Sequence, residues 1–261
     1  MIGGWSFMLR LSLVIVMALL MSACGKKGRL IYPDLLVPES PSSATLRQAG
    51  LGMKLSFVLP QKDRAGQPLT DLAGVRILKR EALPGQPQEC SACMDEFRLF
   101  KTLYVDVRES SVQRYGTMMI VMDGAVTIGR TYSYQAVPFT KAAVDGQGAP
   151  QLTATMVEPP PHPVLRVIPS PTDIRLEFDA TPPAKGTLVG YNLYRAVKGE
   201  TLPFLPLNRA PLQEAHYTDS GLVRRLTYSY AVRMVVRMPS GEMVESSLSN
   251  LADGALLNDE E

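Results

Sequence analysis

The tetrapeptide TYSY stands twice in the chain, at residues 131–134 and 227–230. An aspartate precedes the first tyrosine of each copy by nine residues, at Asp123 and Asp219. Further upstream, two more segments are repeated in the same order: GVRILKR (74–80) with GYNLYRA (190–196), and LSF (55–57) with LEF (176–178). Agreement over several separate segments indicates that one structural unit is present twice.

Apolar residues recur at every second position in both copies, which is the period of a β-strand. The alternating sets are Met53, Leu55, Phe57 and Leu59 against Lys54 and Ser56; Ile174, Leu176 and Phe178 against Arg175 and Glu177; and Tyr228, Tyr230, Val232 and Met234 against Ser229, Ala231, Arg233 and Val235. Strands with one apolar face pack as two sheets around a shared core. We therefore expect an all-β chain in which the second face of each strand is wet.

The second copy resembles a fibronectin type III domain. LEF, GYNLYR, HYTDSGL, TYSYAVR and ESSLSN follow the order of that family's strands B, C, E, F and G. The resemblance implies two tandem sandwiches and assigns Tyr132 and Tyr228 to the family's tyrosine corner, where the hydroxyl of a buried ring bonds the backbone before its strand. The family's strand-B tryptophan is missing, since the only tryptophan is Trp5, and Phe57 and Phe178 are expected in its place.

Composition excludes several classes of protein. Apolar residues make up 46% of the 261 residues and charged residues 20%, which fits neither a disordered chain nor a polytopic membrane protein. The formal net charge is only +2, so we expect no nucleic-acid partner.

The N-terminus has the features of an export signal. Arg10 precedes an uninterrupted apolar run at residues 11–21, which is too short to span a bilayer and is followed by small residues. MSAC (21–24) resembles the bacterial lipobox, which implies cleavage after residue 23 and acylation of Cys24. Several acyl chains give durable anchoring. Gly25 stands where an aspartate favours retention at the inner membrane, so we expect a periplasm-facing protein anchored in the outer membrane.

The residues after the cysteine carry a second resemblance. CGKKGRLIYP (24–33) is similar to the mature start of small outer-membrane lipoproteins that assist maturation of the lipopolysaccharide-translocating barrel. Cys24, Gly25, Lys27, Gly28, Leu30 and Pro33 fit that spacing, and Arg29 replaces the usual proline. The match covers ten residues.

Proline-rich stretches mark the boundaries between segments. PPPHP favours an extended, semi-rigid spacer between the copies. The predicted segments are a signal peptide (1–23), a lipidated N-terminus and linker (24–43), a first domain (44–158), the spacer (159–163), a second domain (164–252) and an acidic tail (253–261).

Cys90 and Cys93 lie in an insertion of about 20 residues that the second copy lacks. In an oxidising periplasm we expect them to form a disulfide that pins the inserted loop. A thioredoxin-like redox role is the alternative, although it needs a thiolate at a helix N-terminus and the pair lies between predicted strands. Haem attachment requires a histidine where Met94 stands, so we do not expect it. A zinc site requires four ligands within reach, and we do not expect one either.

The remaining polar residues indicate no catalytic site, cofactor or metal. His162 is expected to be solvated in the spacer and His216 to lie at a surface or strand edge. Asp123 and Asp219 fall in different domains, and we expect them to form turns. Arg224, Arg225, Arg233 and Arg237 form a basic stretch that suits headgroups, an acidic partner or solvent.

The predicted function is therefore a non-catalytic binding or scaffold module for an envelope protein or glycan, held at the membrane by acylated Cys24. Two alternatives remain open. The first is an envelope-assembly factor that contacts the lipopolysaccharide translocon through residues 24–33. The second is a thiol-disulfide oxidoreductase that uses Cys90 and Cys93.

Overall fold

The computed structural model describes residues 32–82, 97–107 and 109–258. Two units separate along the chain, Met1–Leu36 and Val37–Glu261, and every described strand lies in the second. The only described helix is a short 3₁₀ turn, η1 (Pro33–Leu35). The predicted all-β class is confirmed for the described part of the chain.

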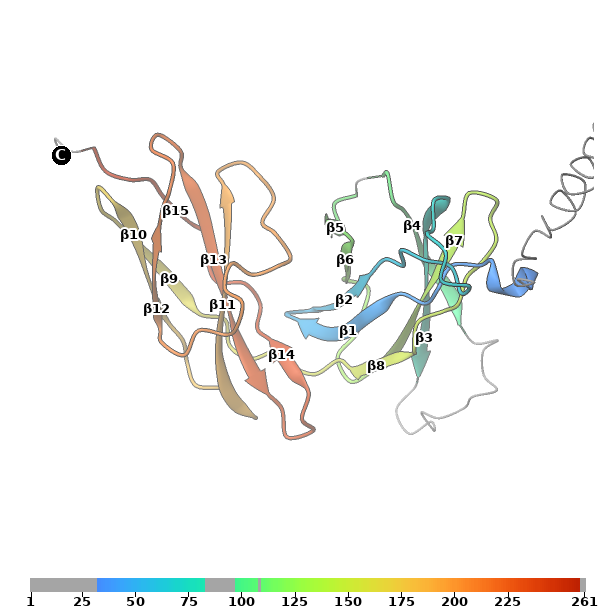
Figure 1. The fold of residues 1–261 in the computed structure, drawn as a ribbon. Helices are drawn as coiled ribbons and strands as arrows, with labels where there is room; N and C mark the ends of the chain where they lie inside the picture. The colour runs from blue at the N-terminus through green and yellow to red at the C-terminus, as the bar shows by residue number, and fades with distance from the viewer. Residues whose placement is uncertain (1–31, 83–96, 108, 259–261) are drawn as a thin grey trace, which may run out of the picture. The chain divides into compact units, whose positions relative to one another are not determined.

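The first sequence copy forms one four-stranded sheet and contributes four strands to a second sheet that continues into the second copy (Figure 1). Their strands are β1 (Ser42–Ala49), β2 (Gly52–Val58), β3 (Leu72–Ala82), β4 (Arg98–Tyr104), β5 (Val112–Tyr115), β6 (Met118–Asp123), β7 (Thr131–Thr140) and β8 (Leu152–Thr155). One sheet has the order β1-β2-β6-β5 and the other the order β4-β3-β7-β8. We call this sandwich domain 1.

The second copy repeats the arrangement as domain 2. Its strands are β9 (Val164–Pro169), β10 (Asp173–Asp179), β11 (Thr187–Val197), β12 (His216–Ser220), β13 (Tyr228–Arg237), β14 (Met243–Glu245) and β15 (Ala252–Gly254). One sheet has the order β12-β10-β9, and in the other β13 pairs with β11, β14 and β15. Both domains thus place strands A, B and E in one sheet, namely β1, β2 and β6 in domain 1 and β9, β10 and β12 in domain 2. Strands C, F and G lie in the other sheet, namely β3, β7 and β8 in domain 1 and β11, β13 and β14 in domain 2, as in fibronectin type III sandwiches.

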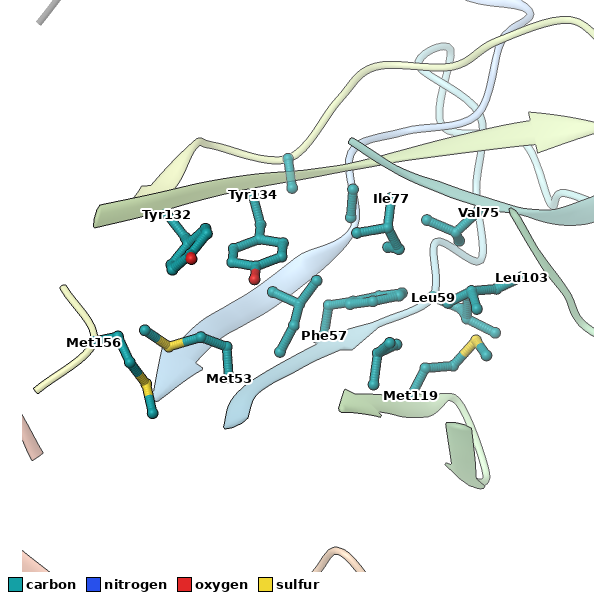
Figure 2. Close-up of a cluster of buried hydrophobic side chains, with 14 residues drawn as sticks. Met53, Phe57, Leu59, Val75, Ile77, Leu103, Met119, Tyr132, Tyr134 and Met156 are labelled. Carbon is teal, nitrogen blue, oxygen red and sulfur yellow. The ribbon is translucent and has the colours of Figure 1, made fainter. Parts of the chain in front are cut away.

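The cores confirm the alternation read from the sequence. In domain 1, Met53, Leu55, Phe57 and Leu59 are buried against Val75, Ile77, Tyr132 and Tyr134 from the opposite sheet, and Figure 2 shows most of these side chains. Ile174, Leu176 and Phe178 occupy the same role in domain 2. Phe57 and Phe178 are nearly inaccessible, as expected for residues that replace the family's tryptophan.

The glycine near the start of β3 and its counterpart in β11 have a packing reason. Gly74 and Gly190 each lie at a shift in the strand register, and a β-carbon on Gly74 would come within 2.1 Å of the Leu103 carbonyl oxygen. On Gly190 it would come within 2.3 Å of the Leu212 carbonyl oxygen, at a φ of +145°. Only a residue without a side chain permits this approach of the neighbouring chain.

The expectation of a wet outer face is wrong for β13. Ala231 and Val235, on the side opposite the core of domain 2, are 1% and 2% exposed. The β1–β2 hairpin of domain 1 covers this side, since a β-carbon on Gly50 would lie 3.1 Å from Nη1 of Arg233. Because β13 is buried on both faces, its sequence is an almost continuous run of apolar residues, as is typical of such strands.

A short parallel ladder joins the two domains. β1 pairs with β14, with Gln48 opposite Val244 and Ala49 opposite Glu245, so that one sheet of each domain continues into the other. Gln48 also exchanges hydrogen bonds with the backbone of Val157, just before the proline-rich spacer. The pairing satisfies two strand edges that would otherwise be open to other chains.

Candidate functional site

Three of the predicted site residues, Cys24, Cys90 and Cys93, lie outside the described residues. The two corner tyrosines are described. The backbone N–H of Thr127 donates a 2.8 Å hydrogen bond to the hydroxyl of Tyr132, and that of Val223 donates a 3.1 Å bond to the hydroxyl of Tyr228. Each bond fixes the loop that precedes the F strand to the tyrosine hydroxyl on that strand. Both tyrosines therefore have a structural role.

The account of Asp219 as a turn residue is incomplete. Its carboxylate is 3% exposed and accepts bonds of 2.7 and 2.8 Å from Nη1 of Arg195 and of 2.8 Å from the hydroxyl of Tyr230. Tyr230 is the second tyrosine of the TYSY repeat, and Arg195 comes from the repeated C strand. The repeated aspartate of domain 2 therefore pairs with a partly exposed guanidinium and a buried phenol.

Asp123 has the equivalent partners in domain 1. Its carboxylate accepts a 2.5 Å bond from Nζ of Lys79 and a 2.6 Å bond from the hydroxyl of Tyr134. Here the turn prediction is also met, since the N–H of Ala125 donates to the other carboxylate oxygen. Both triads lie inside separate domains, as expected, and act as structural clamps between strands.

Burial dominates the titration of the tyrosines in these clusters. Desolvation raises the pKa of Tyr134 and of Tyr230 well above its usual range, and the hydrogen bonds to Asp123 and Asp219 raise each pKa further. Tyr194 behaves in the same way beside Glu245. These phenols stay neutral at physiological pH and donate to carboxylates rather than acting as acids.

A second cluster lies where the domains meet, and we call it the Glu245 cluster: Lys54, Asn192, Tyr194, Arg233 and Glu245. Glu245, 3% exposed, accepts bonds of 2.9 and 3.0 Å from Nζ of Lys54, which belongs to domain 1. It also accepts from Asn192 at 3.0 Å and from Tyr194 at 3.1 Å. One buried carboxylate thus holds groups from both domains.

The predicted basic stretch is divided by this cluster. Arg233 is 15% exposed at its side chain, donates to the Ser246 carbonyl oxygen and lies 3.9 Å from a Glu245 oxygen. Arg224, Arg225 and Arg237 are exposed. The expectation that all four arginines face headgroups, an acidic partner or solvent is therefore wrong for Arg233, because domain 1 covers it.

A loop of domain 2 is held against the edge strand β5 of domain 1. The side-chain amide of Gln113 donates to the carbonyl oxygen of Leu202 at 2.9 Å and accepts from the N–H of Phe204 at 2.6 Å. The hydroxyl of Tyr115 accepts from the same N–H at 3.0 Å. This contact occupies part of β5 and adds to the β1–β14 ladder.

Other edges in the described residues are also covered. The outer edge of β11 bonds to the segment 207–212, through Leu207, Asn208 and Leu212. The outer edge of β9 is met by Asn250, whose side chain exchanges two hydrogen bonds with the backbone of Leu165. Such covering is how sheets avoid adventitious pairing.

Strand β4, like the edge strand β12, differs from these covered edges, and unlike β12 it carries exposed apolar side chains. It ends the β4-β3-β7-β8 sheet, and no backbone partner on its outer side is present within the described ranges. Leu99 and Tyr104 on this strand are 57% and 51% exposed, and Val107 just beyond it is 55% exposed. An open strand edge with apolar side chains is a template for another extended chain. β4 follows the insertion of domain 1 in the sequence and is the candidate binding edge.

The described residues hold no group of three or more histidine, cysteine, aspartate or glutamate side chains able to bind a metal ion. His162 is exposed, and His216 lies on the edge strand β12 with Nε2 3.0 Å from Glu214. Among the described residues no helix is long and apolar enough to cross a membrane.

Sequence reasoning missed both the buried Glu245 cluster and the open edge of β4. Glu245 gave no signal, because a single acid between valine and serine is typical of an exposed strand end. The insertion did point to the neighbourhood of β4, but the open edge follows only from the strand order.

Comparisons with known proteins add the following findings. No protein-family model matches the chain, and no curated protein sequence matches it. Among solved structures, the FN1–FN3 domains of chicken CNTN1 are similar, with 12% sequence identity over 85% of this chain and 69% of that chain and a TM-score of 0.33. The fold assignment rests on the strand order of the two sandwiches.

Proposed function

We propose that the chain is a lipid-anchored, periplasm-facing binding module that takes an extended segment of an envelope protein onto strand β4. Cys24 carries the acyl anchor, and the sandwiches carry the binding surface without catalysing a reaction. Sandwich folds bind in this way through loops and strand edges, and the ligand is decided by the site rather than by the fold.

The observation that carries the proposal is the open edge of β4 with its exposed Leu99 and Tyr104. The N–H of Val105 donates inward to Ala73, so alternation along the strand directs the N–H groups of Thr102 and Tyr104 outward. In strand addition such main-chain groups supply affinity, and alternate side chains supply specificity. Strand β4 offers both outward main-chain N–H groups and exposed side chains for such binding.

The test of the edge uses two substitutions at one position. Thr102→Pro removes an outward N–H, and edge strands tolerate proline. Thr102→Val keeps the N–H and the shape, and is the matched control. We expect affinity capture from membranes to recover a protein partner with the wild type and Thr102→Val, and to lose it with Thr102→Pro at an unchanged melting temperature. Equal recovery with all three, or recovery of a glycan alone, refutes strand addition.

The anchor is tested separately. Mass spectrometry of the membrane fraction should find a chain that starts at residue 24 and carries acyl groups on Cys24. The Cys24→Ser variant should leave the membrane and still capture the same partner in solution, because β4 is far along the chain from the anchor. A chain that retains residues 1–23 with an unmodified Cys24 contradicts the placement.

A further inference from the structure

A cavity of about 220 Å³ opens beside the Glu245 cluster. Its apolar lining comes from both domains, with Ala49 and Met122 on one side and Pro203, Phe204 and Leu248 on the other. Cavities that hold drug-sized ligands measure about 300–1,000 Å³. The cavity therefore has room only for a small ligand, and its walls favour one with apolar surface.

The charged residues that line the same cavity do not balance. Lys54 and Arg233 contribute two positive charges and Glu245 one negative charge. Arg47, opposite Lys54 in the strand register, is exposed and adds a further positive charge nearby. Charges shielded from water are normally paired. The cavity therefore has an excess of one positive charge next to apolar walls.

The guanidinium of Arg233 also has unused donors. Nη1 donates to the Ser246 carbonyl oxygen, whereas Nε lies 3.9 Å from Glu245, too far for a hydrogen bond. Nη2 donates no hydrogen bond to any residue that the structure describes. A guanidinium presents its donors as a planar fork that matches a carboxylate in two parallel bonds.

We propose that this cavity binds a carboxylate attached to a small apolar group, with the carboxylate on Arg233 and the apolar group against Met122 and Phe204. The carboxylate supplies the missing negative charge and the missing acceptors. The amide of the same molecule lacks that charge and is rejected. This site is separate from the β4 edge and does not depend on the proposed function.

Two sources share this chemistry, a free carboxylic acid and the C-terminal carboxylate of a peptide. The probes that separate them are 3-phenylpropionate for the free acid and N-acetyl-phenylalanine for the peptide end. N-acetyl-phenylalanine amide is the uncharged control. The source is the peptide end if N-acetyl-phenylalanine binds more tightly, and the free acid if 3-phenylpropionate binds as tightly or better.

The experiment follows the methionine methyl signals by NMR. The sample is the protein of residues 24–261 with the substitution Cys24→Ser, which contains the whole compact unit Val37–Glu261. We expect both acids to shift the Met122 methyl signal saturably and the amide to leave it in place. Met53 and Met156, buried in the core of domain 1, report whether each variant is folded.

The variants locate the carboxylate. Arg233→Met should weaken binding of the acids about tenfold or more, which corresponds to at least one charged hydrogen bond. Arg237→Met removes an exposed arginine four residues further along and should leave binding unchanged. If Arg233→Met disturbs the core signals, Lys54→Met, which also removes a lining charge, should still weaken binding. Absence of saturable shifts, equal binding of the amide, or equal effects of the Arg233 and Arg237 variants overturns the proposal.

Discussion

Removing the Glu245 carboxylate should destabilise the protein more than removal of any exposed acid. Glu245→Ala leaves Lys54 and Arg233 without their shared counter-ion, and their side chains are only 12% and 15% exposed. Breaking a buried ion pair by deleting one partner costs about 3–5 kcal/mol. Because the side chains of Lys54 and Arg233 keep some exposure, we expect a loss at the lower end of this range, about 3 kcal/mol in the free energy of unfolding.

The assay is urea unfolding followed by circular dichroism, with Glu242→Ala as the matched control. Glu242 is exposed on the same segment, so its removal should change the free energy of unfolding by less than about 0.5 kcal/mol. Combining Glu245→Leu with Lys54→Met should recover part of the loss, because an apolar pair of similar volume replaces a buried ion pair well. A loss below about 1 kcal/mol for Glu245→Ala refutes the reasoning. So does a double variant whose loss equals the sum of the losses of Glu245→Leu and Lys54→Met within about 0.5 kcal/mol.

The other predictions concern the repeated cores. Asp219→Asn removes the charge from a buried carboxylate and should cost about 2 kcal/mol in urea unfolding, and an unchanged midpoint contradicts the clamp. Tyr228→Phe removes one hydroxyl and should cost about 1 kcal/mol, whereas a neutral effect means that the corner bond adds nothing. A tyrosine in the unfolded chain ionises above about pH 10, whereas the buried tyrosines of the folded protein do not. The free energy of unfolding should therefore fall above that pH by about 1.4 kcal/mol per pH unit for each buried tyrosine. Tyr230→Phe should make this fall shallower, and a level stability between about pH 10 and 11 is the contrary result. The phenols concerned are Tyr134, Tyr194 and Tyr230.

The sequence was informative where residues obey a local period. The alternation at Met53–Leu59 and Ile174–Phe178 placed the cores correctly, because a strand directs every second side chain inward. The repeat of TYSY located the F strands and separated Asp123 from Asp219. These features depend on neighbours along the chain.

What the sequence did not predict depends on contacts between distant segments. Arg233 and Val235 follow the pattern of a solvated strand face, yet Val235 is 2% exposed and Arg233 lies against the β1–β2 turn of domain 1. The pairing of β1 with β14 joins residues almost 200 positions apart and leaves no periodic mark. The openness of β4 follows from the lack of a neighbouring strand on its outer side among the residues that the structure describes, and a sequence pattern does not encode this.

The proposed function stands or falls with the β4 edge, and photocrosslinking on intact membranes tests it most directly. A photoreactive residue at Tyr104 should capture one protein partner, and the same residue at Thr218, exposed on the edge strand β12, should not. Capture that depends on the Thr102 N–H, and is therefore lost in Thr102→Pro, is the predicted result. Capture from position 218 alone, or from neither position, contradicts the assignment of β4 as the binding edge.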